Sequence, residues 1–126
     1  MPTPVRRQRD PGWPDSLDAL AAAPANHRLL LENEHARVLE TVIPPGARTP
    51  AHTHRWPSVQ YLCSWSDFLR RDHDGKVVLD TRALPAPQLG AALWSEPLPL
   101  HSVENIGAAE LRVVVVEIKP THLPDL

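Results

Sequence analysis

The hydrophobic positions of this chain come in short runs that are separated by turn residues. From about residue 27 onward, segments of four to eight residues rich in Val, Leu and Ile alternate with Pro, Gly and Asp. Runs of this length with such boundaries are typical of β-strands. The pattern predicts strands near 27–32, 36–43, 58–63, 67–71, 76–81, 90–94, 100–106 and 111–118. Strands at this spacing, with almost no helix between them, indicate an all-β sandwich or barrel.

The segments around these strands carry helix and turn signals. Turn residues at 44–46 predict a turn, and Asp-Gly at 74–75 predicts a hairpin. Residues 15–23 predict a short helix with a polar cap at its start, and the Pro- and Arg-rich residues 1–14 predict an extended arm. We therefore divide the chain into an arm with a short helix at 1–25 and a barrel domain at 26–126.

Length and composition narrow the classes of protein to consider. The 126 residues suit one domain with one modest core, and the net charge of -2 provides no basic surface for nucleic acid. The single cysteine excludes an internal disulfide and favours a reducing compartment. No apolar run is long enough to cross a bilayer, and no secretory signal is recognisable. The sequence therefore predicts a cytoplasmic protein without nucleic-acid or membrane partners.

Three histidines stand at positions that suit a metal ion. On an extended segment, His52 and His54 point the same way and lie about 6.6 Å apart at Cα. Two imidazoles so placed can bind one ion at roughly 2.1 Å each. His101 opens a later predicted strand, and although it lies far away in the sequence, a closed barrel could bring it opposite this pair. The alternative is that His52 and His54 are solvated between Pro50 and Pro57, and that His101 is a hydrogen-bonded core residue.

The same residues resemble the two sequence motifs of the cupin superfamily. Gly46, five further residues and then His52-Thr-His54 match the first half of the first motif, and the segment from His101 to Asn105 matches the end of the second. The stretch over residues 26–119 is similar to small single-domain bacterial cupins. The resemblance implies a double-stranded β-helix, also called a jelly-roll barrel, with a metal site on His52, His54 and His101.

This sequence departs from the family pattern at several positions. The usual glutamate ligand falls at Ser58, which is too short and too weakly basic to replace it. Trp65 and Leu98 stand at two positions where the motifs have glycine. The chain therefore resembles the three-histidine branch of cupins. Iron is the favoured divalent metal, and Zn, Ni, Mn and Cu remain open because imidazole suits several of these ions.

Other residues near the motif are candidates for a ligand pocket. Gln60 and Ser58 share the parity of an inward strand face, and the alternative for Gln60 is a solvated edge position. Arg48 or Arg55 could orient an anionic substrate, and Trp56 could line the mouth of the pocket; exposed loop arginines are the alternative. Three neutral imidazoles leave the full +2 charge of the ion uncompensated, so the site should attract a small anionic chelating molecule.

The remaining noteworthy residues are given structural roles. Cys63 should face away from the metal and pack as a small hydrophobic side chain, and Asn105 should hydrogen bond to backbone. The valine-rich strand at 111–118 should be central or buried on both faces, with no chemistry assigned to it. Trp94 should belong to the core or to an interface. We place the other histidines on the surface: His27, His35, His73 and His122.

Three functions remain open at this stage. The resemblance implies a dioxygenase-like oxidoreductase, because three-histidine cupins include dioxygenases of thiols and of diketones. The first alternative is a metal-dependent isomerase or lyase, which uses the ion as a Lewis acid. The second is a non-catalytic module that binds or senses a small molecule. We also expect a homodimer, because the arm could cross to a partner and exposed edge strands need covering.

Overall fold

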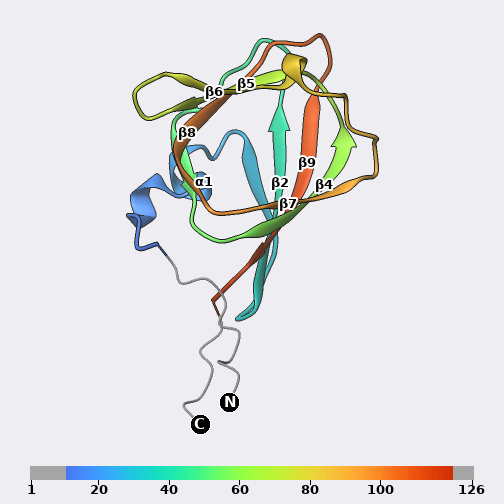
Figure 1. Cartoon of the computed structure of the whole chain (residues 1–126). Helices are drawn as coiled ribbons and strands as arrows, with labels where there is room; N and C mark the ends of the chain where they lie inside the picture. Colours follow the sequence, from blue (N-terminus) through green and yellow to red (C-terminus); the bar gives the residue numbers. More distant parts are fainter. Residues whose placement is uncertain (1–10, 121–126) are drawn as a thin grey trace, which may run out of the picture.

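The computed structural model describes residues 11–120, which form two β-sheets preceded by a short helix (Figure 1). All eight predicted strands are present, with ends shifted by at most two residues. A three-residue strand at the His-x-His motif, β3, is additional. The strands are β1 His27–Glu32, β2 Ala36–Ile43, β3 His52–His54, β4 Ser58–Ser64, β5 Phe68–Asp72, β6 Val77–Asp80, β7 Ala92–Ser95, β8 Leu98–Asn105 and β9 Leu111–Ile118.

The N-terminal helix is shorter than predicted. A 3₁₀ turn, η1 (Asp15–Leu17), precedes α1 (Ala19–Ala22), and a second 3₁₀ turn, η2, spans Thr81–Ala83. Asp18 interrupts the first helix because its backbone is extended and its carboxylate caps α1 by accepting from the backbone N–H of Leu20 at 3.2 Å. No helix among residues 11–120 has the length and apolarity to cross a membrane. Most of the predicted arm at 1–14, and His122, lie outside the described residues.

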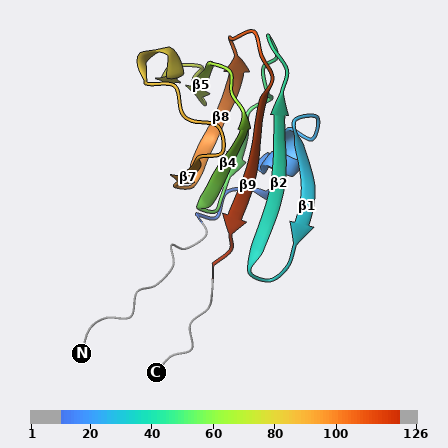
Figure 2. The same cartoon turned by 90° about the vertical axis from the view of Figure 1, so that its right-hand side faces the viewer.

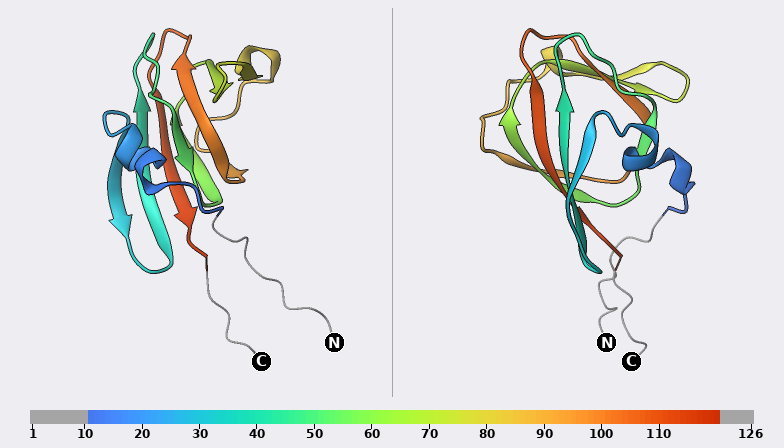
Figure 3. Two further views of the ribbon diagram at one scale, coloured as in Figure 1. Left: turned by 90° about the vertical axis from the view of Figure 1, so that its left-hand side faces the viewer. Right: turned by 180° about the vertical axis from the view of Figure 1, so that it is seen from behind.

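The two sheets are antiparallel throughout and face each other. One has the strand order β1-β2-β9-β4-β7 and the other β3-β8-β5-β6. Figure 2 shows β1, β2, β9 and β4 side by side, with β8 and β5 in the second layer, and the right-hand view of Figure 3 shows how the layers close around an interior. The structure confirms the predicted all-β jelly-roll barrel.

The interior is lined by alternate residues of the central strands. Along β9, the odd-numbered positions from Leu111 to Glu117 are buried, whereas the even-numbered ones are partly or fully exposed. The strand is central in its sheet, which is one of the two predicted alternatives, and it is buried on one face. The buried apolar cluster is Ala19, Leu39, Ile43, Leu62, Leu111, Val113 and Val115. A cavity of about 320 Å³ remains beside it, between the sheets.

Asn105 has the structural role that the sequence predicts. Its side chain is fully buried at the end of β8. The amide nitrogen donates to the backbone carbonyls of Ile43 and Ala109, at 2.9 and 2.8 Å. The amide oxygen accepts from Ser66 Oγ at 2.6 Å and from the backbone N–H of Gly107 at 3.0 Å. One amide side chain thus joins the ends of β2 and β8 to the loop before β9.

Candidate metal centre

The fold brings the three predicted histidines to one end of the cavity. β3 pairs with β8 so that His52 lies directly opposite His101, and a bulge shifts His54 opposite Leu98. The imidazole centroids of His52 and His101 are 4.5 Å apart, and those of His52 and His54 are 5.1 Å apart. All three side chains line the cavity. Thr53, between His52 and His54, points the other way, and its hydroxyl donates to the backbone carbonyl of Leu17 in η1. Strand alternation therefore explains the inward pair.

A fourth histidine, His27, belongs to the same group. It is only 5 % exposed, which corrects its predicted surface position. Its ring centroid lies 4.7 Å from that of His52 and 5.4 Å from that of His54. One side-chain nitrogen from each of these three residues lies within 4.8 Å of the other two, an arrangement that could hold a metal ion. No motif spacing marks His27; the available clue was its place at the start of a predicted strand.

Each of the four histidines has an oxygen acceptor at its Nδ1 atom. Backbone carbonyl oxygens accept from Nδ1 of His27, His52 and His101 at 3.0, 2.8 and 2.7 Å. A carboxylate oxygen of Glu117 lies 3.5 Å from Nδ1 of His54. Because these oxygens only accept, the imidazole proton lies on Nδ1 and the lone pair of Nε2 remains for the cavity. Outer hydrogen bonds of this kind orient metal-ligating histidines. The donor set thus fits a divalent metal ion.

Burial keeps three of these imidazoles uncharged. It lowers the pKa of His27 to about 4, that of His52 to about 2 and that of His101 to about 3, and the nearby His54 adds to each shift. The charged form of a histidine is disfavoured when water is excluded and another imidazole lies close. These side chains are therefore neutral at pH 7, the form that a metal ion requires.

The metal-free protein should lose stability as the pH falls below about 6.5. In the unfolded chain a histidine titrates near pH 6.5, whereas His27, His52 and His101 stay neutral in the fold to about pH 4 or below. The unfolded state therefore binds more protons in this window, and each histidine costs up to about 1.4 kcal/mol per pH unit. Urea unfolding of chelator-treated protein at pH 7.5, 6.5 and 5.5 measures this loss; equal stability at the three values would contradict the burial argument.

A network of buried charged side chains contacts His54 at its Nδ1 atom, on the side away from the cavity. Glu117, which is fully buried, accepts from Arg37 Nε at 2.7 Å, and the two terminal nitrogens of Arg37 donate to the Asp18 carboxylate at 2.9 and 2.8 Å. Burial opposes ionisation of Glu117, but hydrogen bonds with His54 and Arg37 outweigh it and hold the pKa of Glu117 below its usual value. The cap of α1 is thereby linked to a cavity histidine.

Sequence reasoning missed the role of Glu117 because it treated the last strand as purely structural. The signal that could have revealed it is the odd-numbered position of Glu117, which places its side chain on the inward face of the strand. Glu117 continues the inward row of Leu111, Val113 and Val115, so a carboxylate ends an otherwise apolar face. It also lies directly opposite Ser58, where the family pattern has its glutamate ligand. The carboxylate stands behind His54 instead of lining the cavity.

Of the predicted pocket residues, Gln60 lines the cavity and the others do not. Ser58 is buried but lies outside the lining. Arg48 is exposed, with one terminal nitrogen 3.3 Å from Ser102 Oγ. Arg55 forms an ion pair with Asp15 at 2.6 Å, and its guanidinium lies 5.5 Å from the centre of the Trp56 ring. These four residues therefore lie outside the cavity lining, and contact of any of them with a substrate stays a prediction.

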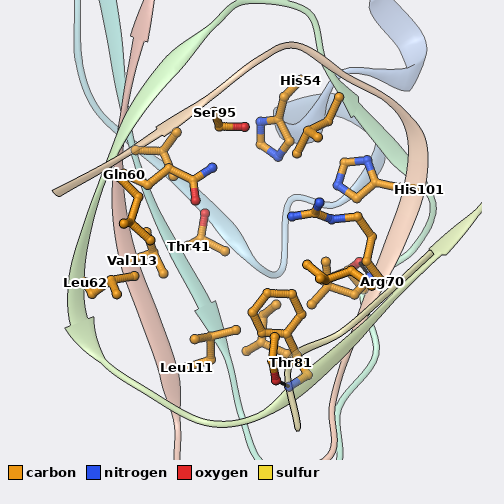
Figure 4. Close-up of a pocket in the computed structure, with 18 of the residues that line it drawn as sticks. Thr41, His54, Gln60, Leu62, Arg70, Thr81, Ser95, His101, Leu111 and Val113 are labelled. Atoms are coloured by element: carbon orange, nitrogen blue, oxygen red, sulfur yellow. Dashed lines mark hydrogen bonds between the residues drawn. The ribbon is translucent and has the colours of Figure 1, made fainter. Parts of the chain in front are cut away.

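Two further expectations change. Trp94 is 58 % exposed and lines the cavity, so it is not a core residue, and its predicted place in an interface stays a prediction. Cys63 does not line the cavity, as expected, but it is only half-buried and thus not a core residue. Among the cavity-lining residues that the sequence did not indicate is an arginine, Arg70 (Figure 4).

Comparisons with known proteins bear on the fold. No family model matches the sequence, and the curated proteins give no match. The chain is similar to the solved structure of a cupin domain from Bordetella pertussis Tohama I, at 25 % identity and a TM-score of 0.60 over 74 % of this chain and 91 % of that one. It is also similar to an RmlC-like cupin family protein from Methanocaldococcus jannaschii, at 16 % identity and a TM-score of 0.54 over 75 % and 79 % of the two chains. The chain is also similar to a conserved protein with a double-stranded β-helix domain from Klebsiella pneumoniae, at 19 % identity and a TM-score of 0.53 over 75 % of each chain.

Proposed function

Because the chain is a small cupin-domain protein, we propose that it binds one divalent metal ion and acts as a metal-dependent enzyme on a small anionic chelating substrate. The ligands in this proposal are His52, His54 and His101, together with His27. The proposal is supported by the clustered side-chain nitrogens of His27, His52 and His54 and by the Nδ1 hydrogen bonds that leave Nε2 available. A cytoplasmic location, which the single cysteine favours, is part of it.

The observation that carries the proposal of an anionic substrate is the lack of acidic side chains in the described cavity wall. Among residues 11–120, no aspartate or glutamate lines the cavity, whereas four histidines and Arg70 do. A divalent ion held there would keep its full charge, lower the pKa of a bound substrate group and polarise it. The wall therefore favours an anionic ligand such as an enolate, carboxylate or thiolate.

The protein's own residues would orient the ligand and exclude water. Figure 4 shows the Gln60 amide and the Thr41 hydroxyl directed into the same space as His54 and His101. Most of the remaining wall is apolar, which limits the access of water and strengthens electrostatic contacts inside. Glu117 and the backbone carbonyls fix the histidine rings, so the site is organised before a ligand enters.

Within this proposal, a dioxygenase-like reaction with iron is favoured by the resemblance to three-histidine cupins. Protein purified without an affinity tag should be loaded separately with Fe²⁺, Zn²⁺, Ni²⁺, Mn²⁺ and Cu²⁺, then given thiols, diketones and enolisable acids. We expect oxygen uptake with Fe²⁺ for at least one of these classes. Substrate loss without oxygen uptake would favour an isomerase or lyase. Absence of turnover together with a ligand-raised melting temperature would favour a binding module.

We also propose a homodimer formed through the edge strand β1. The strand pairs only with β2 among the described residues, and three consecutive leucines on it, Leu29, Leu30 and Leu31, are 46 %, 44 % and 53 % exposed. An apolar edge of this kind invites pairing with a second copy. Light scattering should give a dimer for the unmodified chain and a monomer for Leu31→Lys. Val78→Lys, at the edge strand β6, should remain dimeric; a monomeric parent protein would refute the proposal.

A further inference from the structure

Arg70 extends into the cavity beside the histidine group. On β5 it pairs with Val103 of β8, and His101 lies two residues earlier on β8, so Arg70 and His101 are diagonal neighbours on the inner face of one sheet. Phe68, two residues before Arg70 on β5, shares this face and lines the cavity. Figure 4 shows the guanidinium directed toward the centre of the cavity, on the side of His101. The arginine therefore lies next to the proposed metal ligands.

The guanidinium of Arg70 has no protein partner among residues 11–120. Its buried Nε has no hydrogen-bond acceptor, and no carboxylate lies within ion-pair distance of the side chain. The neighbouring Arg71 differs, since it donates to Glu104 at 2.7 Å, and the buried Arg37 is paired with two carboxylates. Burial lowers the pKa of Arg70, and no neighbouring acid opposes this effect. The residue as a whole is half-buried, but a guanidinium whose Nε is shielded from water without an acceptor is costly unless a ligand completes it.

The surroundings of Arg70 define the ligand that would complete it. A planar guanidinium fork matches the two oxygens of one carboxylate, with which it forms paired hydrogen bonds. The rest of the nearby wall is mostly apolar and offers a surface for a hydrocarbon group, and a volume of about 320 Å³ suits a small molecule. The apolar side chains that line it include Phe68, Leu79, Leu84, Leu93, Leu98 and Val103.

We propose that Arg70 binds the carboxylate of a small organic acid whose apolar body packs against this wall and whose second donor group faces the histidines. The position of the second donor depends on the proposed metal site. The contact between the carboxylate and Arg70 does not, because the arginine lies in the cavity whether or not a metal is bound. A neutral molecule of the same shape would leave the charge of Arg70 uncompensated and should be rejected.

The carboxylate contact is tested on metal-free protein. We expect calorimetric titration to detect binding of 4-methylpentanoate and to show at least tenfold weaker binding of 4-methylpentanamide, which has the same shape without the charge. Arg70→Met should lose at least tenfold in affinity for the acid and should have a raised melting temperature, because it removes the unpaired cation. Arg71→Met, the same change on the outer face, should bind the acid within twofold of the parent protein.

Variants and metal loading separate this inference from the proposed metal site. Arg70→Lys keeps the charge without the fork and should bind the acid more weakly than the parent protein. Arg70→Met should retain the parent protein's Zn²⁺ stoichiometry. With Zn²⁺ bound, 4-methyl-2-oxopentanoate, which carries a second donor, should bind more tightly than 4-methylpentanoate. If Zn²⁺ does not bind at all, the proposed metal site fails while the titration of metal-free protein still tests Arg70.

Three results would overturn the inference. One is equal binding of the acid by Arg70→Met and the parent protein, or no binding by the parent protein. A second is equally tight binding of inorganic phosphate or of the neutral amide, since the site would then not select a carboxylate. The third is loss of stability and of Zn²⁺ in both Arg70 variants, which would make the arginine a support for the histidines.

Discussion

Replacing His101 with alanine should weaken metal binding by about 100-fold or more while the fold survives. The His101 ring lines the cavity 4.5 Å from that of His52, and its Nδ1 donates to the Pro99 carbonyl at 2.7 Å, so its Nε2 is the atom that would bind the metal. Loss of outer-sphere support alone typically costs 10–100-fold in metal affinity, and loss of a ligand costs more. Metal content after dialysis against graded chelator, with circular dichroism of the same samples, measures both parts.

A matched histidine controls for this change. His73 is exposed in the hairpin between β5 and β6, beside Asp72 and Asp74, and forms a second group of potential ligands at the surface. His73→Ala should leave the metal content unchanged. Full metal content in His101→Ala would remove His101 from the site, and unchanged affinity in His27→Ala would reduce the ligand set to the three histidines of the motifs.

Replacing Arg37 with leucine should destabilise the protein by about 3–5 kcal/mol. Arg37 is the shared partner of two buried carboxylates, those of Asp18 and Glu117, and its loss leaves both without a cation at that place. Stranding a buried charge in this way is among the most destabilising single changes. Urea unfolding gives the magnitude. Arg48→Leu is the control and should change the stability little, because Arg48 is exposed and its side chain makes a weak 3.3 Å contact with Ser102 Oγ.

A second substitution distinguishes stranded charge from lost packing. In the Arg37→Leu background, Glu117→Leu removes one of the two stranded carboxylates and should restore part of the lost stability. If the two changes simply add as independent losses, the network is not held together by charge. The same double variant should bind metal more weakly than the parent protein, because Glu117 no longer orients the His54 ring.

Local pattern was sufficient to predict most of the fold. Valine-rich runs bounded by proline, glycine and aspartate placed eight strands, because strand propensity and turn chemistry act over a few neighbouring residues. The exception is β3, a three-residue strand at 52–54 whose pairing with β8 depends on residues almost fifty positions away. The division of the N-terminal helix depended on the extended backbone of Asp18, whose side chain also forms an ion pair with the distant Arg37.

The site was only partly predictable because its members meet across strands. His52 and His54 are visible as a spaced pair, and the resemblance to a known motif singled out His101. His27 and Arg70 have no such spacing, and their positions follow from the register of β1 on β2 and of β5 on β8. Proximity in sequence was misleading for Arg55 and Trp56, since they follow His54 directly but pack outside the cavity lining.

The most direct test of the central claim is the anomalous diffraction signal from crystals of tag-free protein soaked with a divalent metal such as Zn²⁺. The account predicts one strong peak per chain inside the barrel, with Nε2 atoms of His27, His52, His54 and His101 as its neighbours. A peak at the surface group of Asp72, His73 and Asp74 alone, or no peak among the buried histidines, would contradict it.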